Sequence, residues 1–397
     1  MPRSLALSPF VQRLRPSVFA SLVAQFKTLP SPPAPLHLGD TYRPPPEQAR
    51  LEHAVALLPA NGYAYANPNG HEGLRQAVAE RMGRCGLPGL GLEHVHVTSG
   101  GTGAIAAVWH TLLAPGDEVL ILAPFWPLVR GIVHSVGAVP IEVPFYHRMR
   151  QGESVDTILA PYVTERTAAL YVTSPNNPCG TVLSAAQMLE VATFCQRHDL
   201  WALADEAYYD FCFDDQPHPL LASLPGMAQR TASVFTCSKS YALAGIRLGF
   251  LVGDPSWLDA ARRATTHQIY NVPLVCQLSA MQAVVHGDAW VAETRGLYRQ
   301  AADLTHRSLQ AKFALSQGGG YVFVDLAEEL RGRDVYAYLS ELLREGVCVS
   351  PGDAFGQHFG SWVRVCYTAV PLPALEVALG KLNRSLERIR RGEPLAV

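Results

Sequence analysis

The sequence predicts an α/β protein: a mostly parallel sheet covered by helices on both faces, with a smaller α+β domain beside it. Short apolar runs alternate with helical stretches from about residue 48, and this alternation is typical of a parallel sheet that is buried on both faces. The chain has 397 residues, more than the ~250–300 residues at which one hydrophobic core usually stops growing. We therefore expect two domains.

The expected elements follow a simple order. A short helix is predicted near Val18 to Phe26, and the proline-rich residues 29–35 are expected to be extended because proline cannot sustain a helix. Strands of the large sheet are predicted at five apolar runs, residues 95–97, 118–122, 168–172, 201–204 and 249–252. Two more strand-like runs, residues 320–325 and 363–367, precede an amphipathic C-terminal helix. We assign residues 48–285 to a large domain, and residues 1–47 and 286–397 to a small domain.

Composition and charge exclude several classes of protein. Hydrophobic residues make up 48% of the chain and charged residues 17%, which argues against disorder. The formal net charge of −2 gives no electrostatic basis for binding nucleic acid. No apolar run reaches the ~18 residues of a membrane span and no signal-peptide pattern is present, so we expect a cytoplasmic protein. The eight cysteines lack the paired spacing of a zinc site or a disulfide framework, so we expect no metal.

The most informative stretch is residues 236–250, which combines one amine, several hydroxyls and one fixed cation. Lys239 becomes a nucleophile toward a carbonyl only when its amine can lose a proton, which burial and a nearby positive charge promote. Arg247 is a candidate for that charge, and its guanidinium can also grip a phosphate through two parallel hydrogen bonds. The flanking glycines are expected to permit close backbone approach. These groups suit a phosphorylated aldehyde; the alternative is a surface lysine beside a structural arginine.

This run closely resembles the pyridoxal-phosphate lysine signature of the class I aminotransferases, the fold-type I family that includes aspartate aminotransferase. In that family a phosphate-binding arginine follows the lysine by eight positions, and here 247 − 239 = 8. Further segments match family motifs in the same order along the chain, at residues 100–103, 174–180, 205–208 and 362–364. The resemblance implies a seven-stranded type of large sheet, a pyridoxal 5'-phosphate cofactor bound to Lys239 as an aldimine, and transfer of an amino group between an L-amino acid and a 2-oxo acid.

Asp205 is the candidate partner of the cofactor's ring nitrogen. It follows a predicted strand, and a protonated pyridine ring acts as an electron sink only beside a buried anion. A helix N-cap is the alternative, because aspartate is common there. Tyr208 and Asn177 resemble the family residues that contact the phenolic oxygen from its two sides. The asparagine segment departs from the family pattern at Ser174 and Cys179, and a plain turn is its alternative interpretation.

The phosphate site is expected where the glycine-rich residues 100–103 precede a helical stretch, because free backbone amides at the start of a helix bind anions. Gly101 and Thr102 are the candidates in this segment, and a tight turn is the alternative. Further hydroxyls and a cation are expected to come from the lysine run, at Thr236, Ser238 and Arg247.

Two aromatic positions enter the cofactor site by resemblance. Trp126, chosen over Phe125, matches the ring that stacks on the pyridine face, although a tryptophan after an apolar strand is more often core. Tyr65 matches the tyrosine that reaches the phosphate of the neighbouring subunit's cofactor, with Tyr63 as a competing candidate. A site completed across a twofold interface implies a homodimer.

The substrate site is centred on Arg364, which lies in an otherwise apolar strand-like run where an unpaired charge would be costly. The family uses the matching arginine as the fork for the substrate α-carboxylate, together with Gly39 and Asn177, and with Trp126 at the same site. A structural buried ion pair is the alternative. His267 lies near the position where aspartate aminotransferases place a second arginine. It could serve an acidic, aromatic or polar side chain, or be a surface group.

The resemblance also predicts cis peptide bonds at Ala123-Pro124 and Asn177-Pro178. Two other functions stay open at this point. The same site could serve a β-lyase, a cyclase or an oxygen-using enzyme, because one scaffold can route the chemistry several ways. A non-catalytic sensor domain of a transcription regulator would need a DNA-binding domain in front, and only about 35 residues precede the predicted fold.

Overall fold

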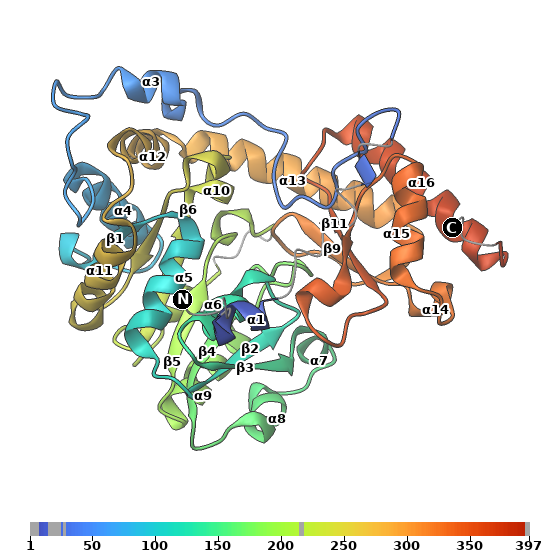
Figure 1. Ribbon diagram of the computed structural model, residues 1–397, viewed down its shortest axis with the longest axis horizontal. Coiled ribbons are helices and arrows are strands. Elements are labelled where there is room, and N and C mark those ends of the chain that lie inside the picture. The colour runs from blue at the N-terminus through green and yellow to red at the C-terminus, as the bar shows by residue number, and fades with distance from the viewer. Residues whose placement is uncertain (1–7, 15–24, 27–28, 214–217, 394–397) are drawn as a thin grey trace, which may run out of the picture.

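The computed structural model describes residues 8–14, 25–26, 29–213 and 218–393. Within these residues the chain forms a seven-stranded, mostly parallel sheet and a four-stranded antiparallel sheet. In Figure 1 the larger sheet and its helices occupy the left and lower part of the molecule. The smaller sheet lies at the right, with α14 (Ala327–Leu330), α15 (Val335–Arg344) and α16 (Leu372–Arg390). The predicted class, an α/β protein with a smaller α+β part, is confirmed.

The strands of the large sheet are β1 Val95–Thr98, β2 Glu118–Ala123, β3 Val139–Pro144, β4 Thr167–Thr173, β5 Trp201–Asp205, β6 Thr231–Thr236 and β7 Gly249–Val252. Their order is β1-β7-β6-β5-β4-β2-β3. The neighbours from β3 to β6 pair in parallel, whereas β7 runs antiparallel to both β6 and β1. The carboxyl ends of β2, β4, β5 and β6 therefore lie on one edge, where sheets of this kind bind ligands.

Helices surround the large sheet. The longer ones are α4 Glu72–Arg84, α5 Gly100–Leu112, α6 Leu128–Ser135, α9 Ala185–Arg197, α11 Pro255–Ile269 and α12 Leu274–His286. The shorter ones are α1 Pro9–Arg13, α3 Leu51–Val55, α7 Tyr146–Arg150, α8 Val155–Leu159 and α10 Cys237–Ser240.

Successive residues of the central strands pack into different hydrophobic cores. Val119 and Ile121 of β2 join a core with α5, α6 and α11. Leu120 and Leu122 of the same strand join another core with α7, α8 and α9. Because side chains alternate between the two faces of a strand, these two cores cover opposite faces of the sheet. Burial on both faces explains why the strands are continuous apolar runs in the sequence.

The smaller sheet has the order β10-β11-β9-β8, and its strands are β8 Lys312–Phe313, β9 Tyr321–Asp325, β10 Ser350–Pro351 and β11 Trp362–Cys366. All its pairs are antiparallel, and Arg364 of β11 lies opposite Phe323 of β9. The long helix α13 (Asp288–Ser308) packs against α16 beside this sheet. The domain boundaries near residues 48 and 285 stay a prediction.

The strand runs predicted from the sequence are confirmed to within one residue, as β1, β2, β4, β5, β7, β9 and β11. The sequence did not predict β3, β6, β8 or β10. The start of α5 was predicted wrongly: α5 begins at Gly100, so the glycine-rich segment forms its first turn instead of preceding it. The helix predicted near Val18 to Phe26 falls mostly outside the described residues.

Both predicted cis bonds, Ala123-Pro124 and Asn177-Pro178, are present, and Ser174-Pro175 is a third that the sequence did not predict. Among the described helices, none is both long enough and apolar enough to cross a membrane.

Candidate active site

Four parallel strands end side by side and deliver residues to one place. β2 ends at Ala123, β4 at Thr173, β5 at Asp205 and β6 at Thr236. A cavity of about 190 Å³ lies at this edge of the sheet. Its lining residues are Gly101, Thr102, Ile105, Trp126, Thr173, Asn177, Asp205, Ala207, Tyr208, Thr236, Ser238, Lys239, Ala244 and Arg247. The motifs that are scattered along the sequence therefore converge.

Lys239 lies on α10, the short helix that follows β6 directly. The Thr236 hydroxyl accepts a hydrogen bond from the Ser238 backbone N–H at 3.2 Å and caps this turn. Lys239 Nζ donates to the carbonyl oxygen of Gly39. Burial lowers the pKa of the Lys239 amine, and the Asp40 carboxylate opposes this effect. The amine therefore loses its proton at a lower pH than an ordinary lysine.

Asp205 is the last residue of β5 and lines the cavity. Tyr171 Oη donates to Asp205 Oδ2 at 2.6 Å, and the Ala207 N–H donates to Oδ1 at 3.2 Å. Burial raises the pKa of Asp205 to about 6, although these two hydrogen bonds act to lower it. The next helical element, η5 (Tyr209–Phe211), has Tyr208 as its N-cap. The interpretation of Asp205 as a helix cap is therefore wrong.

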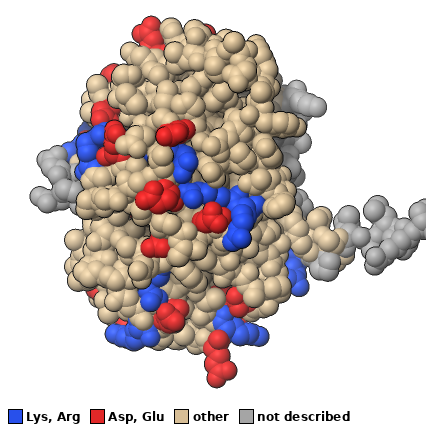
Figure 2. Space-filling model, turned by 90° about the vertical axis from the view of Figure 1, so that its left-hand side faces the viewer, with Lys and Arg blue, Asp and Glu red and all other residues tan. Residues whose placement is uncertain are grey.

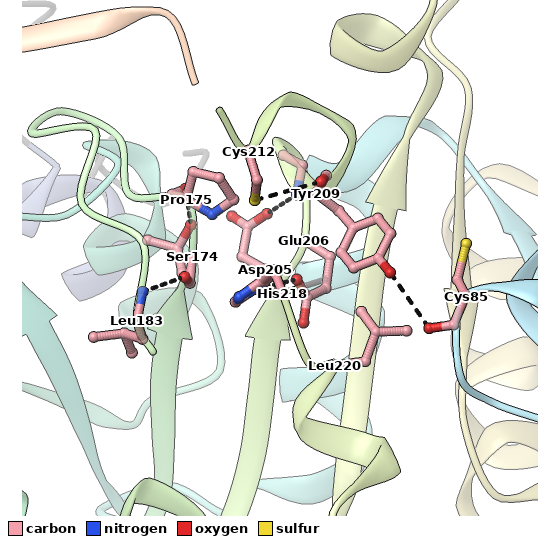
Figure 3. A network of polar contacts seen from close by, with 12 residues as sticks. Cys85, Ser174, Pro175, Leu183, Asp205, Glu206, Tyr209, Cys212, His218 and Leu220 are labelled. Carbon is pink, nitrogen blue, oxygen red and sulfur yellow. Dashed lines mark hydrogen bonds and ion pairs between the residues drawn. The ribbon is translucent and has the colours of Figure 1, made fainter. Parts of the chain in front are cut away.

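The acidic residue after Asp205 is placed differently. Figure 3 shows the side chains of Asp205 and Glu206 pointing in opposite directions at the end of β5. Glu206 Oε2 lies 3.6 Å from His218 Nε2, and both of these side chains are buried. Of the two neighbouring carboxylates, it is Asp205 that lines the cavity.

The first turn of α5 faces a fixed cation. A Cβ atom on Gly100 would lie 2.6 Å from Arg247 Nη2, so a larger residue would push the guanidinium away from this turn. A Cβ atom on Gly249 would lie 2.7 Å from the backbone of Gly100, whereas Gly245 has open space around it. The sequence predicted that both glycines allow close approach of another backbone segment. This prediction is correct for Gly249 and wrong for Gly245. Arg247 has φ 54° and ψ 50°, which is uncommon outside glycine, and Nη1 donates to Ala244 O at 2.9 Å.

Arg364 lies beside the cavity and is buried. Its Nη1 donates to Asn177 Oδ1 at 2.9 Å, and its Nη2 donates to His37 O at 2.6 Å and to Ser350 Oγ at 3.2 Å. Within the described part of the chain this guanidinium has no carboxylate partner, and its Nε has no hydrogen bond. The interpretation of Arg364 as half of a structural ion pair is therefore wrong. A buried cation that lacks an anion is suited to bind one.

Some predicted residues lie elsewhere. Trp126 lines the cavity and Phe125 is buried in the core, which agrees with the choice between them. Tyr65 and Tyr63 are 88% and 96% exposed and do not line the cavity of this chain. His267 is an exposed residue near the end of α11 and is also outside the cavity.

Two tyrosines of the site were not predicted. Tyr171 donates to Asp205, and Tyr321 contacts both Tyr208 and Arg364. Both residues belong to strands that the sequence did predict. Their contacts are with residues that are distant in sequence. The sequence could not predict them because they depend on how the strands and loops are aligned in the fold.

Comparison with known proteins identifies the family. The family model for aminotransferase class I and II matches residues 36–382. The chain is 34% identical to arginine–pyruvate transaminase AruH of Pseudomonas aeruginosa, over 79% of this chain and 80% of that protein. It is 32% identical to aromatic-amino-acid aminotransferase 2 of Thermococcus litoralis, over 89% and 91%. A single mutant of Thermus thermophilus aspartate aminotransferase superposes with a TM-score of 0.87 at 28% identity, over 96% and 100%. The chain belongs to the class I and II aminotransferases, and its activity is amino-group transfer.

This family uses pyridoxal phosphate, and the residues present fit that group. Asp205 is a buried carboxylate that forms no ion pair with a described residue, and a protonated pyridine nitrogen would supply the missing cation. The first turn of α5 and Arg247 provide backbone donors and a guanidinium for a phosphate. Lys239 provides an amine with a lowered pKa for an aldehyde.

Proposed function

We propose that the cavity at the carboxyl edge of the large sheet is where this aminotransferase moves an amino group between an L-amino acid and a 2-oxo acid, with Lys239 as the residue that attaches the cofactor. The observation that supports this most is that Lys239, Asp205 and Arg247 line one cavity. The Arg364–Asn177 contact lies directly beside it. The site thus combines an amine, a carboxylate for the ring nitrogen of the cofactor, one arginine for its phosphate and a second arginine for the substrate carboxylate.

Besides its attachment at Lys239, the cofactor would be held by residues at the edge of the sheet and in the first turn of α5. When bound, pyridoxal phosphate supplies an aldehyde for attachment and a ring that takes up electron density from the substrate α-carbon. Asp205 would favour a proton on the ring nitrogen, and Trp126 would offer a flat surface to the ring. Arg247 and Thr102 bind the phosphate at the first turn of α5.

The remaining residues act on the substrate. Arg364 and Asn177 fix its α-carboxylate, and this sets the direction of the bond to the α-proton. In its free, uncharged form the Lys239 amine would be the base that takes up that proton and gives it back during transfer. The lowered pKa of Lys239 favours the uncharged amine that this step needs.

A panel of amino donors tests the proposed reaction. Aspartate, an aromatic amino acid and arginine are the first donors to use, because the names of the relatives cover these three, with pyruvate and 2-oxoglutarate as acceptors. We expect the oxo acid from the donor and the amino acid from the acceptor to form in equal amounts. Release of ammonia and an oxo acid without an acceptor would contradict transfer and favour the lyase alternative.

The two arginines should be separable by mutation. Arg364→Lys is expected to weaken substrate binding by about 2–3 kcal/mol, because an ammonium cannot reproduce a two-pronged grip on a carboxylate. Arg247→Lys is expected to weaken cofactor retention first. Titrating substrate and cofactor separately in each variant measures the two effects. If both substitutions affect the cofactor alone, Arg364 has no direct role in substrate binding.

The dimer remains a proposal that a surface of this chain supports. Large apolar side chains of α3 and the following loop are exposed, at Leu51, Val55, Leu57, Tyr63 and Tyr65. The Tyr65 ring packs against that of Tyr270, the residue after α11, with centroids 5.0 Å apart. Figure 2 shows charged side chains of both signs across the middle and toward the lower end of the face containing α3, α4 and α11, with uncharged surface above them. We expect twice the 43.1 kDa chain mass in sedimentation, and a stable monomer would contradict the shared site.

The predicted cytoplasmic location also stays a proposal. It is supported by the eight cysteines, all of which are free thiols in the structure.

A further inference from the structure

Two buried tyrosine hydroxyls meet between the two sheets. Tyr208 follows β5 of the large sheet and Tyr321 begins β9 of the small sheet, and their hydroxyl groups form a hydrogen bond with each other. The rings cross at 81° with centroids 5.5 Å apart. Both tyrosines also line a smaller space that contains Lys239 and Gly39. This contact joins the two halves of the structure beside the reactive lysine.

The protons of this pair can be counted. Two hydroxyls carry two protons, and their mutual hydrogen bond uses one of them. Among the described residues neither hydroxyl has another hydrogen-bond partner. Tyr208 lines the large cavity, whereas Tyr321 does not. If Tyr321 donates to Tyr208, the hydroxyl proton of Tyr208 is left free. Because Tyr208 lines the large cavity, that proton can be donated to an acceptor inside it.

The Tyr321 ring has a second contact. In the antiparallel pair of β9 and β11, Tyr321 lies opposite Cys366, and Arg364 is two residues before Cys366 on the same face. The Arg364 guanidinium carbon lies 4.5 Å from the centre of the Tyr321 ring, within the range of a cation–π interaction. The ring thus supports the guanidinium that faces Asn177.

Gly39 lies against the Tyr321 hydroxyl and leaves no room for a side chain of its own. A Cβ atom on Gly39 would lie 2.5 Å from Tyr321 Oη and 3.7 Å from Arg364 Nη1. Gly39 was predicted to lie at the substrate carboxylate, and the absence of a side chain there also makes room for the Tyr321 hydroxyl. The carbonyl of Gly39 accepts from Lys239 Nζ at the same time.

We infer that Tyr321 is a positioning residue for the transfer reaction: its hydroxyl directs the Tyr208 proton toward the phenolic oxygen of the cofactor, and its ring supports Arg364 at the substrate carboxylate. The inference rests on the proposed function. A chain of two hydroxyls donates more strongly than one, because each hydrogen bond polarises the next. The charged or titratable groups around Tyr321 are Arg364, Cys366, Tyr208, Asp40, Tyr298 and Tyr367, and Lys239 lines the same small space.

Substitutions at Tyr321 separate its two contacts. Tyr321→Phe removes the hydroxyl and keeps the ring. A weaker hydrogen bond from Tyr208 leaves the phenolic oxygen of the cofactor more basic. The absorbance of the bound cofactor changes as it gains or loses a proton, and the pH at the midpoint of this change should rise by roughly 0.5 unit. The dissociation constant of pyridoxal phosphate from the protein should rise about threefold, with the substrate KM unchanged. Tyr321→Leu removes the ring too and should also raise KM, by roughly 5- to 10-fold.

Tyr338→Phe is the matched control, because it removes an equally buried hydroxyl from α15, away from the cavity. This control should keep the wild-type midpoint, cofactor affinity and KM. Wild-type values in Tyr321→Phe would overturn the inference, and so would an equal shift in both phenylalanine variants, which would indicate a general effect of losing a buried hydroxyl. If the wild-type protein bound no pyridoxal phosphate, the proposed function itself would fail.

Discussion

Lys239→Ala is expected to lower turnover by a factor of about 10⁴ or more, the scale on which enzymes lose activity when a residue that is both nucleophile and base is removed. The chain has four lysines in all, at positions 27, 239, 312 and 381. Of the three lysines among the described residues, Lys239 is the one that lines the cavity. Steady-state kinetics with the best donor from the panel measures the loss.

The control for this substitution is Lys312→Ala. Lys312 is exposed on β8 and lies 3.6 Å from Glu328 in a surface ion pair, which contributes little to stability. Turnover of Lys312→Ala should equal that of the wild type. Turnover of Lys239→Ala within tenfold of wild type would show that the reaction does not depend on this amine.

Asp205→Asn is expected to lower turnover about 100-fold or more while the protein stays folded. An amide is neutral, so it no longer favours the proton on the ring nitrogen, and the ring takes up electrons less readily. The shape of the side chain is almost unchanged, and Tyr171 can still donate to its oxygen. Near-wild-type turnover would contradict the assignment of Asp205.

The same substitution has a second effect, on the cofactor-free protein. Burial raises the pKa of Asp205 from 3.8 to about 6, so folding favours the protonated acid. The stability that this gives is fully present below pH 3.8 and is lost as the pH rises through about 6. A shift of roughly two units corresponds to about 3 kcal/mol at most, of which on the order of 1 kcal/mol is lost between pH 5 and pH 7.5.

The amide introduced by Asp205→Asn does not titrate, so this loss should be absent in the variant. Urea unfolding of both cofactor-free proteins at pH 5 and pH 7.5 measures it. The free energy of unfolding of the wild type should fall relative to that of Asp205→Asn as the pH rises. An identical difference between the two proteins at both pH values would show that the pKa of Asp205 is not raised.

The strands that carry the site could be predicted where they are apolar. β2, β4 and β5 are buried on both faces and read as continuous hydrophobic runs. β6 was missed although it leads to Lys239, because Thr231 and Ser233 are buried polar residues that interrupt its apolar pattern. β3 was missed because it contains two prolines, which a strand at the edge of a sheet tolerates.

The residues of the site were predicted where short motifs carry them. Asp205 ends β5, and Lys239 lies three residues after the end of β6. Each belongs to a short motif whose other members also line the cavity, such as Tyr208 and Arg247. Contacts between distant segments could not be predicted in this way. Tyr321 meets Gly39 and Tyr208 through the packing of the small sheet, and no local pattern encodes that geometry.

Tyr65 shows a different limit. Its exposed ring has no access to the cavity of its own chain, so its predicted role requires a second copy. His267 is also exposed and does not line the cavity of its own chain. The donor panel tests whether this histidine affects the choice of substrate side chain.

Reduction of the cofactor-loaded protein with borohydride, followed by peptide mapping, tests the central claim most directly. Borohydride makes the link between an amine and an aldehyde permanent, so the modified lysine can be found by mass spectrometry. With only four lysines in the chain, the answer is unambiguous. The site predicts a yellow protein in which the cofactor is found on Lys239. A cofactor mass on Lys27, Lys312 or Lys381, or no covalent link to any lysine, would contradict it.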